Sequence, residues 1–64
     1  MTARAVATWN PTISQQIAEL RRELVIRRQV FPKWVAAHKL TQRDMDYRIA
    51  CIEATIALLE GLPS

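Results

Sequence analysis

The chain is poor in the residues that usually stabilise very small proteins. Its 64 residues include one cysteine, Cys51, and one histidine, His38. A single cysteine excludes a disulfide within the chain, and together with a single histidine it cannot form a Cys/His zinc site. A core of this size rarely supplies more than a few kcal/mol of stability, so oligomerisation is the expected additional source.

Several other features are also missing, and each excludes a class of function. A single glycine leaves no glycine-rich phosphate loop, and no paired set of catalytic carboxylates is present. No apolar run approaches the roughly 18 residues of a membrane span, and no signal-peptide pattern opens the chain. We therefore predict no catalytic residues, metal ligands, cofactor or small-molecule substrate. The expected protein is a non-enzymatic, cytoplasmic one with a reduced thiol and no membrane contact.

The composition is that of a folded chain: half of the residues are hydrophobic and the net charge is +3. Residues 1–10 show no sustained periodicity and are predicted to form a flexible N-terminal arm. Trp9 either docks onto the core or lies in solvent. Residues 11–62 are predicted to form one helical-hairpin domain, whose first helix is capped by Asn10 or by Thr12 in a capping box with Gln15.

The first helix is predicted over about 11–31. Apolar residues recur at steps of four and three, interrupted once at Arg27, and they form one face: Ile13, Ile17, Leu20, Leu24, Phe31 and Trp34. Pro32 cannot donate a backbone hydrogen bond, so the helix should end or kink there, with a short helical turn over about 33–38.

The second helix is predicted over about 42–60. Thr41 is its expected N-cap, and Leu40 and Met45 are placed to make a hydrophobic staple. Gly61 is expected to end it in the left-handed conformation, before Pro63. Its apolar face steps by four and three through Met45, Ile49, Ile52, Ile56 and Leu59. The fold class is therefore all-α: an antiparallel αα-hairpin with a kinked or extended turn at Pro32.

A second apolar stripe lies on the second helix, roughly opposite the first at about 100° per residue. It consists of Tyr47, Cys51, Ala54 and Leu58. A two-helix hairpin buries only one stripe, so this one is the predicted oligomer or partner interface. A homodimer that forms a four-helix bundle is the favoured assembly, and a higher oligomer is the alternative.

Charged rows border the main apolar faces. Asp46, Glu53 and Glu60 are spaced by seven, as are Arg21 and Arg28, so the rows are expected to pair across the hairpin. Arg27 is expected to lay its alkyl stem on the apolar face, or to form a partly buried ion pair that sets the register.

Residues 21–39 contain six basic residues and one glutamate, a net charge of +5. Nucleic-acid binding is therefore an alternative function, because arginine side chains match phosphate oxygens. The candidate contacts to nucleic acid or an acidic partner are Arg21, Arg22, Arg28, Lys33 and Lys39. Within the first helix, however, Glu19 and Glu23 are placed to pair with Arg22 and Arg27, which favours a solvated, self-paired face.

A family resemblance rests on residues of both helices and the turn: Arg27, Val30, Phe31, Pro32, Trp34, Val35, Leu40, Thr41, Ile49, Glu53, Ala54, Ile56 and Leu59. This pattern resembles short uncharacterised helical-hairpin proteins encoded by bacteriophages and prophages, and it departs from them around Asp46 and Tyr47. The resemblance implies phage origin and a location in the bacterial host cytosol, and it implies no catalytic activity. The architecture alone is also similar to the RNA-binding plasmid repressor-of-primer protein.

These observations predict a small phage-type regulatory or protein-interaction module. It is expected to self-associate and to bind a host or phage protein. Nucleic-acid binding through the basic face of the first helix and inhibition of a host enzyme are the alternative hypotheses.

Overall fold

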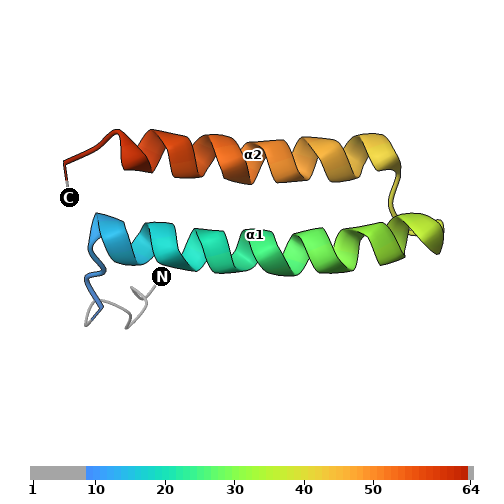
Figure 1. The fold of residues 1–64 in the computed structure, drawn as a ribbon, viewed down its shortest axis with the longest axis horizontal. Coiled ribbons are helices and arrows are strands. Elements are labelled where there is room, and N and C mark those ends of the chain that lie inside the picture. Colours follow the sequence, from blue (N-terminus) through green and yellow to red (C-terminus); the bar gives the residue numbers. More distant parts are fainter. Residues whose placement is uncertain (1–8, 64) are drawn as a thin grey trace, which may run out of the picture.

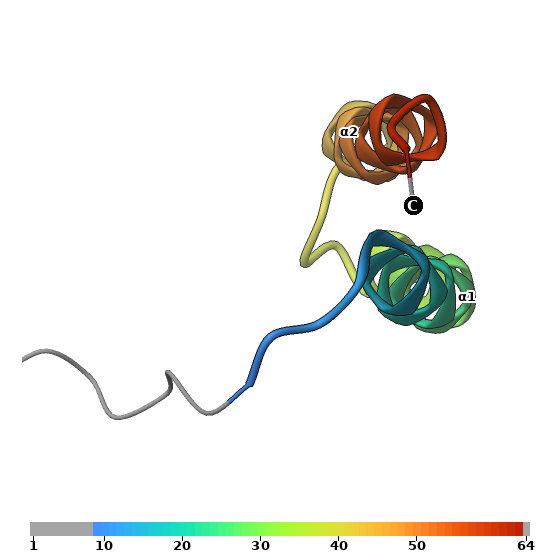
Figure 2. The same cartoon turned by 90° about the vertical axis from the view of Figure 1, so that its left-hand side faces the viewer.

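The computed structural model describes residues 9–63, which form two α-helices and no strand. Helix α1 spans Ile13–Ala36 and helix α2 spans Gln42–Glu60. The helices run antiparallel and side by side (Figure 1), and the end-on view shows one helix lying directly over the other (Figure 2). The predicted all-α hairpin is confirmed. Most of the predicted arm, residues 1–8, lies outside the described residues.

Helix α1 begins at the second of the two predicted caps. The Gln15 amide donates to the Thr12 hydroxyl over 3.1 Å, and the Thr12 amide donates to the Gln15 side-chain oxygen over 2.9 Å. This reciprocal capping box satisfies two backbone donors that the first turn of a helix leaves free. Trp9 lies outside this helix start with 82% of its surface exposed, so it does not dock onto the core.

The sequence predicted that the first helix would end or kink near Phe31. Helix α1 does not end there but continues through Pro32 to Ala36. The predicted separate turn over 33–38 is therefore mostly the last turn of the same helix. Arg28 and Pro32 are both exposed, so on this side of the helix water can replace the helical donor that the Arg28 carbonyl loses. On either side of Pro32, the rings of Phe31 and Trp34 contact each other in a tilted arrangement with centroids 5.5 Å apart, and this contact favours helical geometry at this end.

The turn between the helices is a Schellman motif built around a histidine. The Lys39 amide donates to the Trp34 carbonyl over 2.8 Å, and the His38 amide donates to the Val35 carbonyl over 3.0 Å. His38 adopts a φ of +59°, the left-handed position that glycine usually occupies in this motif. A non-glycine side chain here carries a steric cost.

The start of helix α2 confirms the prediction, and its end corrects one. Thr41 is the N-cap, and its hydroxyl accepts from the Asp44 amide over 3.0 Å. Gly61 is the C-cap as expected, but with φ −81° and ψ −5° it is right-handed rather than left-handed. The Gly61 amide still bonds the carbonyls of the last turn, so a left-handed residue is not needed to end this helix.

The core between the helices is thin. Only Leu24, Phe31 and Ile56 are buried among the described residues, while the other predicted apolar residues are half-buried, except Trp34. Trp34 is 43% exposed, so its predicted place in the core is only partly correct. At about 100° per residue it lies on the border of the apolar face beside Arg27, where one side of the ring remains open.

Candidate functional site

One flank of the hairpin is a ladder of ion pairs, as the charge pattern predicted. Arg21 pairs with Glu60, and Arg28 pairs with Glu53. The third acidic residue of the row, Asp46, has no cationic partner among residues 9–63, because the antiparallel register places Val35 opposite it. Its carboxylate instead accepts from the Gln42 side chain of the same helix over 3.0 Å.

The other arginines of helix α1 pair within the helix. Arg22 lies 3.8 Å from Glu19, and Arg27 Nε donates to Glu23 over 2.9 Å. The Arg27 guanidinium also stands 5.8 Å from the centre of the Phe31 ring, close enough for a cation–π contact. Arg27 therefore lies along the apolar face as expected, and its ion-pair partner is on its own helix.

The candidate nucleic-acid contacts separate into two groups. Arg21, Arg22 and Arg28 are exposed and already engage carboxylates of the chain. Lys33 and Lys39 are exposed and make no ion pair with the carboxylates of residues 9–63, and the same holds for Arg43 and Arg48. The uncompensated basic charge thus lies toward the turn rather than along the middle of helix α1.

The outer stripe, defined as Tyr47, Cys51, Ala54 and Leu58, lies on the side of helix α2 turned away from helix α1. All four residues are exposed, and Tyr47 and Leu58 are 69% and 70% exposed. Helix α1 buries a different face of helix α2, the one that contains Ile56. The hairpin therefore presents this stripe to solvent or to another surface.

Tyr47 and Cys51 interact one helical turn apart within the outer stripe. A hydrogen bond with the Cys51 thiol raises the pKa of the Tyr47 phenol above its ordinary value of 10.0, and the charge of the ionised thiol and slight desolvation add to this. The phenol is therefore neutral at physiological pH. A neutral phenol is the form that an interface can cover without burying a charge.

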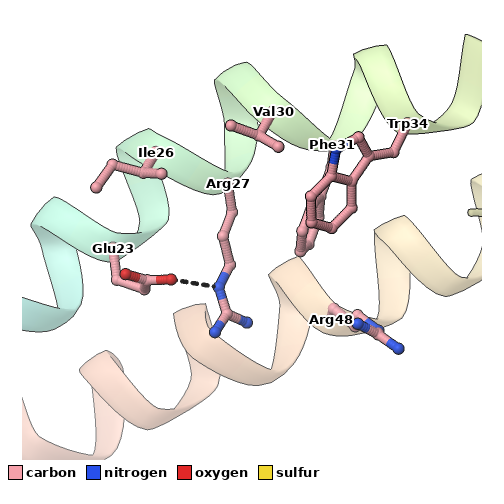
Figure 3. A pocket seen from close by; sticks show the side chains of 7 residues that line it. All are labelled: Glu23, Ile26, Arg27, Val30, Phe31, Trp34 and Arg48. Atoms are coloured by element: carbon pink, nitrogen blue, oxygen red, sulfur yellow. Dashed lines mark hydrogen bonds and ion pairs between the residues drawn. The ribbon is translucent and has the colours of Figure 1, made fainter.

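The flank opposite the ion-pair ladder holds an open groove of about 410 Å³. Helix α1 supplies most of its lining, namely Glu23, Ile26, Arg27, Val30, Phe31 and Trp34. Helix α2 supplies Arg48, whose side chain projects from the far side of the groove (Figure 3). We call this feature the flank groove.

Sequence reasoning missed the flank groove. Ile26, Val30 and Trp34 are spaced by four and therefore share one line on helix α1, which is a signal that the sequence does contain. Trp34 was instead assigned to the main apolar face, and Arg48 was not singled out. Only the antiparallel pairing of the helices brings Arg48 to the border of that line.

Residues 9–63 provide neither the side-chain cluster of a metal site nor a helix suited to crossing a membrane. No group of three or more His, Cys, Asp or Glu side chains is arranged to hold a metal ion. Neither of the two helices combines the length and the apolar character that crossing a membrane requires.

Comparisons with protein-family models, curated proteins and solved structures find no significant match for this chain.

Proposed function

We propose that this protein is a non-catalytic, self-associating protein-interaction module in which two hairpins pack through the outer stripe into a four-helix bundle. The observation that carries the proposal is the exposure of Tyr47 and Leu58, at 69% and 70%, on the face of helix α2 that helix α1 leaves uncovered. Apolar side chains aligned on one helix face favour burial against another apolar surface.

A second copy is the favoured occupant because the outer stripe is self-complementary. Its spacing of four, three and four is the same in both directions, so an antiparallel copy places Tyr47 against Leu58 and Cys51 against Ala54. The small Cys51 and Ala54 at the centre allow the helices to approach closely. Because each hairpin buries three side chains among residues 9–63, the additional burial would stabilise both copies.

The biological role that we propose is regulatory binding to a host or phage protein in the cytosol of a bacterial host. The resemblance in the turn and in the second helix motivates the phage setting. Inhibition of a host enzyme is one form that such binding takes. The ion pairs of Arg21, Arg22 and Arg28 favour a protein partner over a nucleic acid, because phosphates would have to displace carboxylates already in place.

Disulfide cross-linking tests the proposed packing. Wild-type chain, with its single Cys51, is mixed with the double variant Cys51→Ser/Ala54→Cys and oxidised under mild conditions. Each chain then has one thiol, so every disulfide joins two chains. The antiparallel register brings residues 51 and 54 of different copies opposite each other, so mass spectrometry should find the mixed disulfide as the dominant product.

The control is Cys51→Ser/Ala57→Cys, which moves the thiol to another exposed face of helix α2. Mixed disulfide should form much more slowly with this variant. Equal rates for the two variants would contradict packing through the outer stripe.

A further inference from the structure

The flank groove has the dimensions of a site for a short helix. Ile26, Val30 and Trp34 form an apolar row along helix α1, and Figure 3 shows Ile26 and Val30 lying along the helix rather than between the two helices. Eight residues of helix span about 12 Å, which matches two turns of a partner helix. Apolar anchors on one face of such a helix would fill this row.

The charged side chains around the flank groove differ in whether they already have a partner. Arg27 is bonded to Glu23 and stands over Phe31, so both of these charges are used within the chain. Arg48 makes no ion pair with the carboxylates of residues 9–63. It also lines a neighbouring hollow of about 580 Å³ near the turn, together with Lys39 and the carboxylate of Asp44, which does not line the flank groove itself. The turn end of the groove is therefore apolar on helix α1 and positively charged on helix α2.

A second copy of the chain offers little matching negative charge, because among residues 9–63 only Asp44 and Asp46 lie outside ion pairs. Within residues 9–63, four carboxylates are in ion pairs, one accepts from a glutamine and one lies in the first turn of helix α2: Glu19, Glu23, Glu53, Glu60, Asp46 and Asp44. Nucleic acid fits less well, since Trp34 is the one ring of this row and the Ile26 and Val30 side chains beside it offer no surface on which a base can stack.

We propose that the flank groove binds an amphipathic helix of a partner protein, with apolar residues on the Ile26, Val30 and Trp34 row and an acidic residue against Arg48. This inference deepens the proposed function and rests on it, because it names the partner's chemistry and where it binds. The outer stripe remains the self-association surface, so each surface is tested by its own variant.

Selection from a displayed library of amphipathic helical peptides of about 16 residues, or roughly four turns, tests this proposal. The full-length protein is the bait, and all positions outside the apolar face of the peptide are randomised. We expect the selected peptides to carry Asp or Glu next to an apolar anchor. Their synthetic forms should bind the wild-type protein in fluorescence anisotropy, and replacing that acid with Asn or Gln should weaken binding.

Two matched charge reversals on helix α2 locate the site. Arg48→Glu should weaken binding of the selected peptides by about tenfold or more, because it places like charges together. Arg43→Glu changes the charge of the protein equally but lies outside the flank groove, so it should leave the affinity within about twofold. Trp34→Ala should also weaken binding, since it removes one end of the apolar row.

Other outcomes would overturn the proposal. Peptides without acidic enrichment, no binding peptides at all, or equal effects of Arg48→Glu and Arg43→Glu would each do so. Dissociation of the oligomer by Arg48→Glu would assign the groove to a second copy. A single-stranded DNA probe that binds more tightly than the selected peptides, and whose binding Arg48→Glu weakens, would assign the flank groove to nucleic acid. Self-association is measured separately, by the disulfide cross-linking of residues 51 and 54, so failure of the groove and failure of the outer stripe are distinguishable.

Discussion

At the scale of single residues, His38 and Gly61 exchange the conformations that their types suggest. The sequence places the left-handed residue at Gly61, the only glycine, yet the structure places it at His38 with φ +59°. The reason is that helix α1 extends to Ala36, which makes residue 38 the position that closes the Schellman motif. That position depends on where the helix ends, so residue type alone did not identify it.

His38→Gly should stabilise the protein. Glycine removes the clash of Cβ at positive φ, and we expect a gain of about 0.5–1 kcal/mol in the free energy of unfolding after its extra freedom in the unfolded chain is counted. Urea unfolding followed by circular dichroism at one fixed protein concentration measures this gain. Loss of stability would contradict the assigned turn.

Gly61→Ala is the matched comparison. A Cβ at Gly61 would lie 3.5 Å from the Leu58 carbonyl oxygen and 3.8 Å from that of Ala57, which are ordinary contacts. Because Gly61 is right-handed, the alanine variant should be as stable as the wild type or slightly more so. A left-handed Gly61 would instead make this substitution destabilising.

At the scale of the helices, periodicity predicted most of the hairpin. The steps of four and three identified the faces that contain Leu24, Phe31 and Ile56. The spacing of seven identified the two charged rows that pair, and the structure shows which residues meet: Arg21 with Glu60 and Arg28 with Glu53. The predicted end of helix α1 was wrong because the expectation that proline ends or kinks a helix considers only the local backbone. That expectation does not include the exposed position of Pro32, or the contact between Phe31 and Trp34 that stabilises the helix past the proline.

The ion-pair ladder should contribute to stability only where an arginine of helix α1 faces a carboxylate of helix α2. A double-mutant cycle between Arg28→Ala and Glu53→Ala should give a coupling energy of about 0.5–1 kcal/mol in low salt, which declines as salt is added. Urea unfolding at fixed protein concentration measures each variant. The same cycle between Val35→Ala and Asp46→Ala should give a coupling near zero. Similar coupling in both cycles would contradict the register.

At the scale of the whole molecule, the outer stripe and the flank groove are uncovered and the core is thin. The outer stripe was predicted from the sequence because it is periodic within one helix. The flank groove was not, because Arg48 and the row of Ile26, Val30 and Trp34 come from different helices and meet only in the fold. A surface that spans two helices depends on their register and orientation, and the sequence reasoning used register only for the charged rows.

The central claim is that the outer stripe joins copies of the chain, and sedimentation at micromolar concentration tests it most directly. The wild type should sediment as an oligomer of the 7.3 kDa chain, with a dimer expected. Ala54→Glu should dissociate it and leave monomers of low helicity, whereas Ala57→Glu, on another face of helix α2, should remain associated. A wild-type protein that sediments as a stable, well-folded monomer would contradict the account.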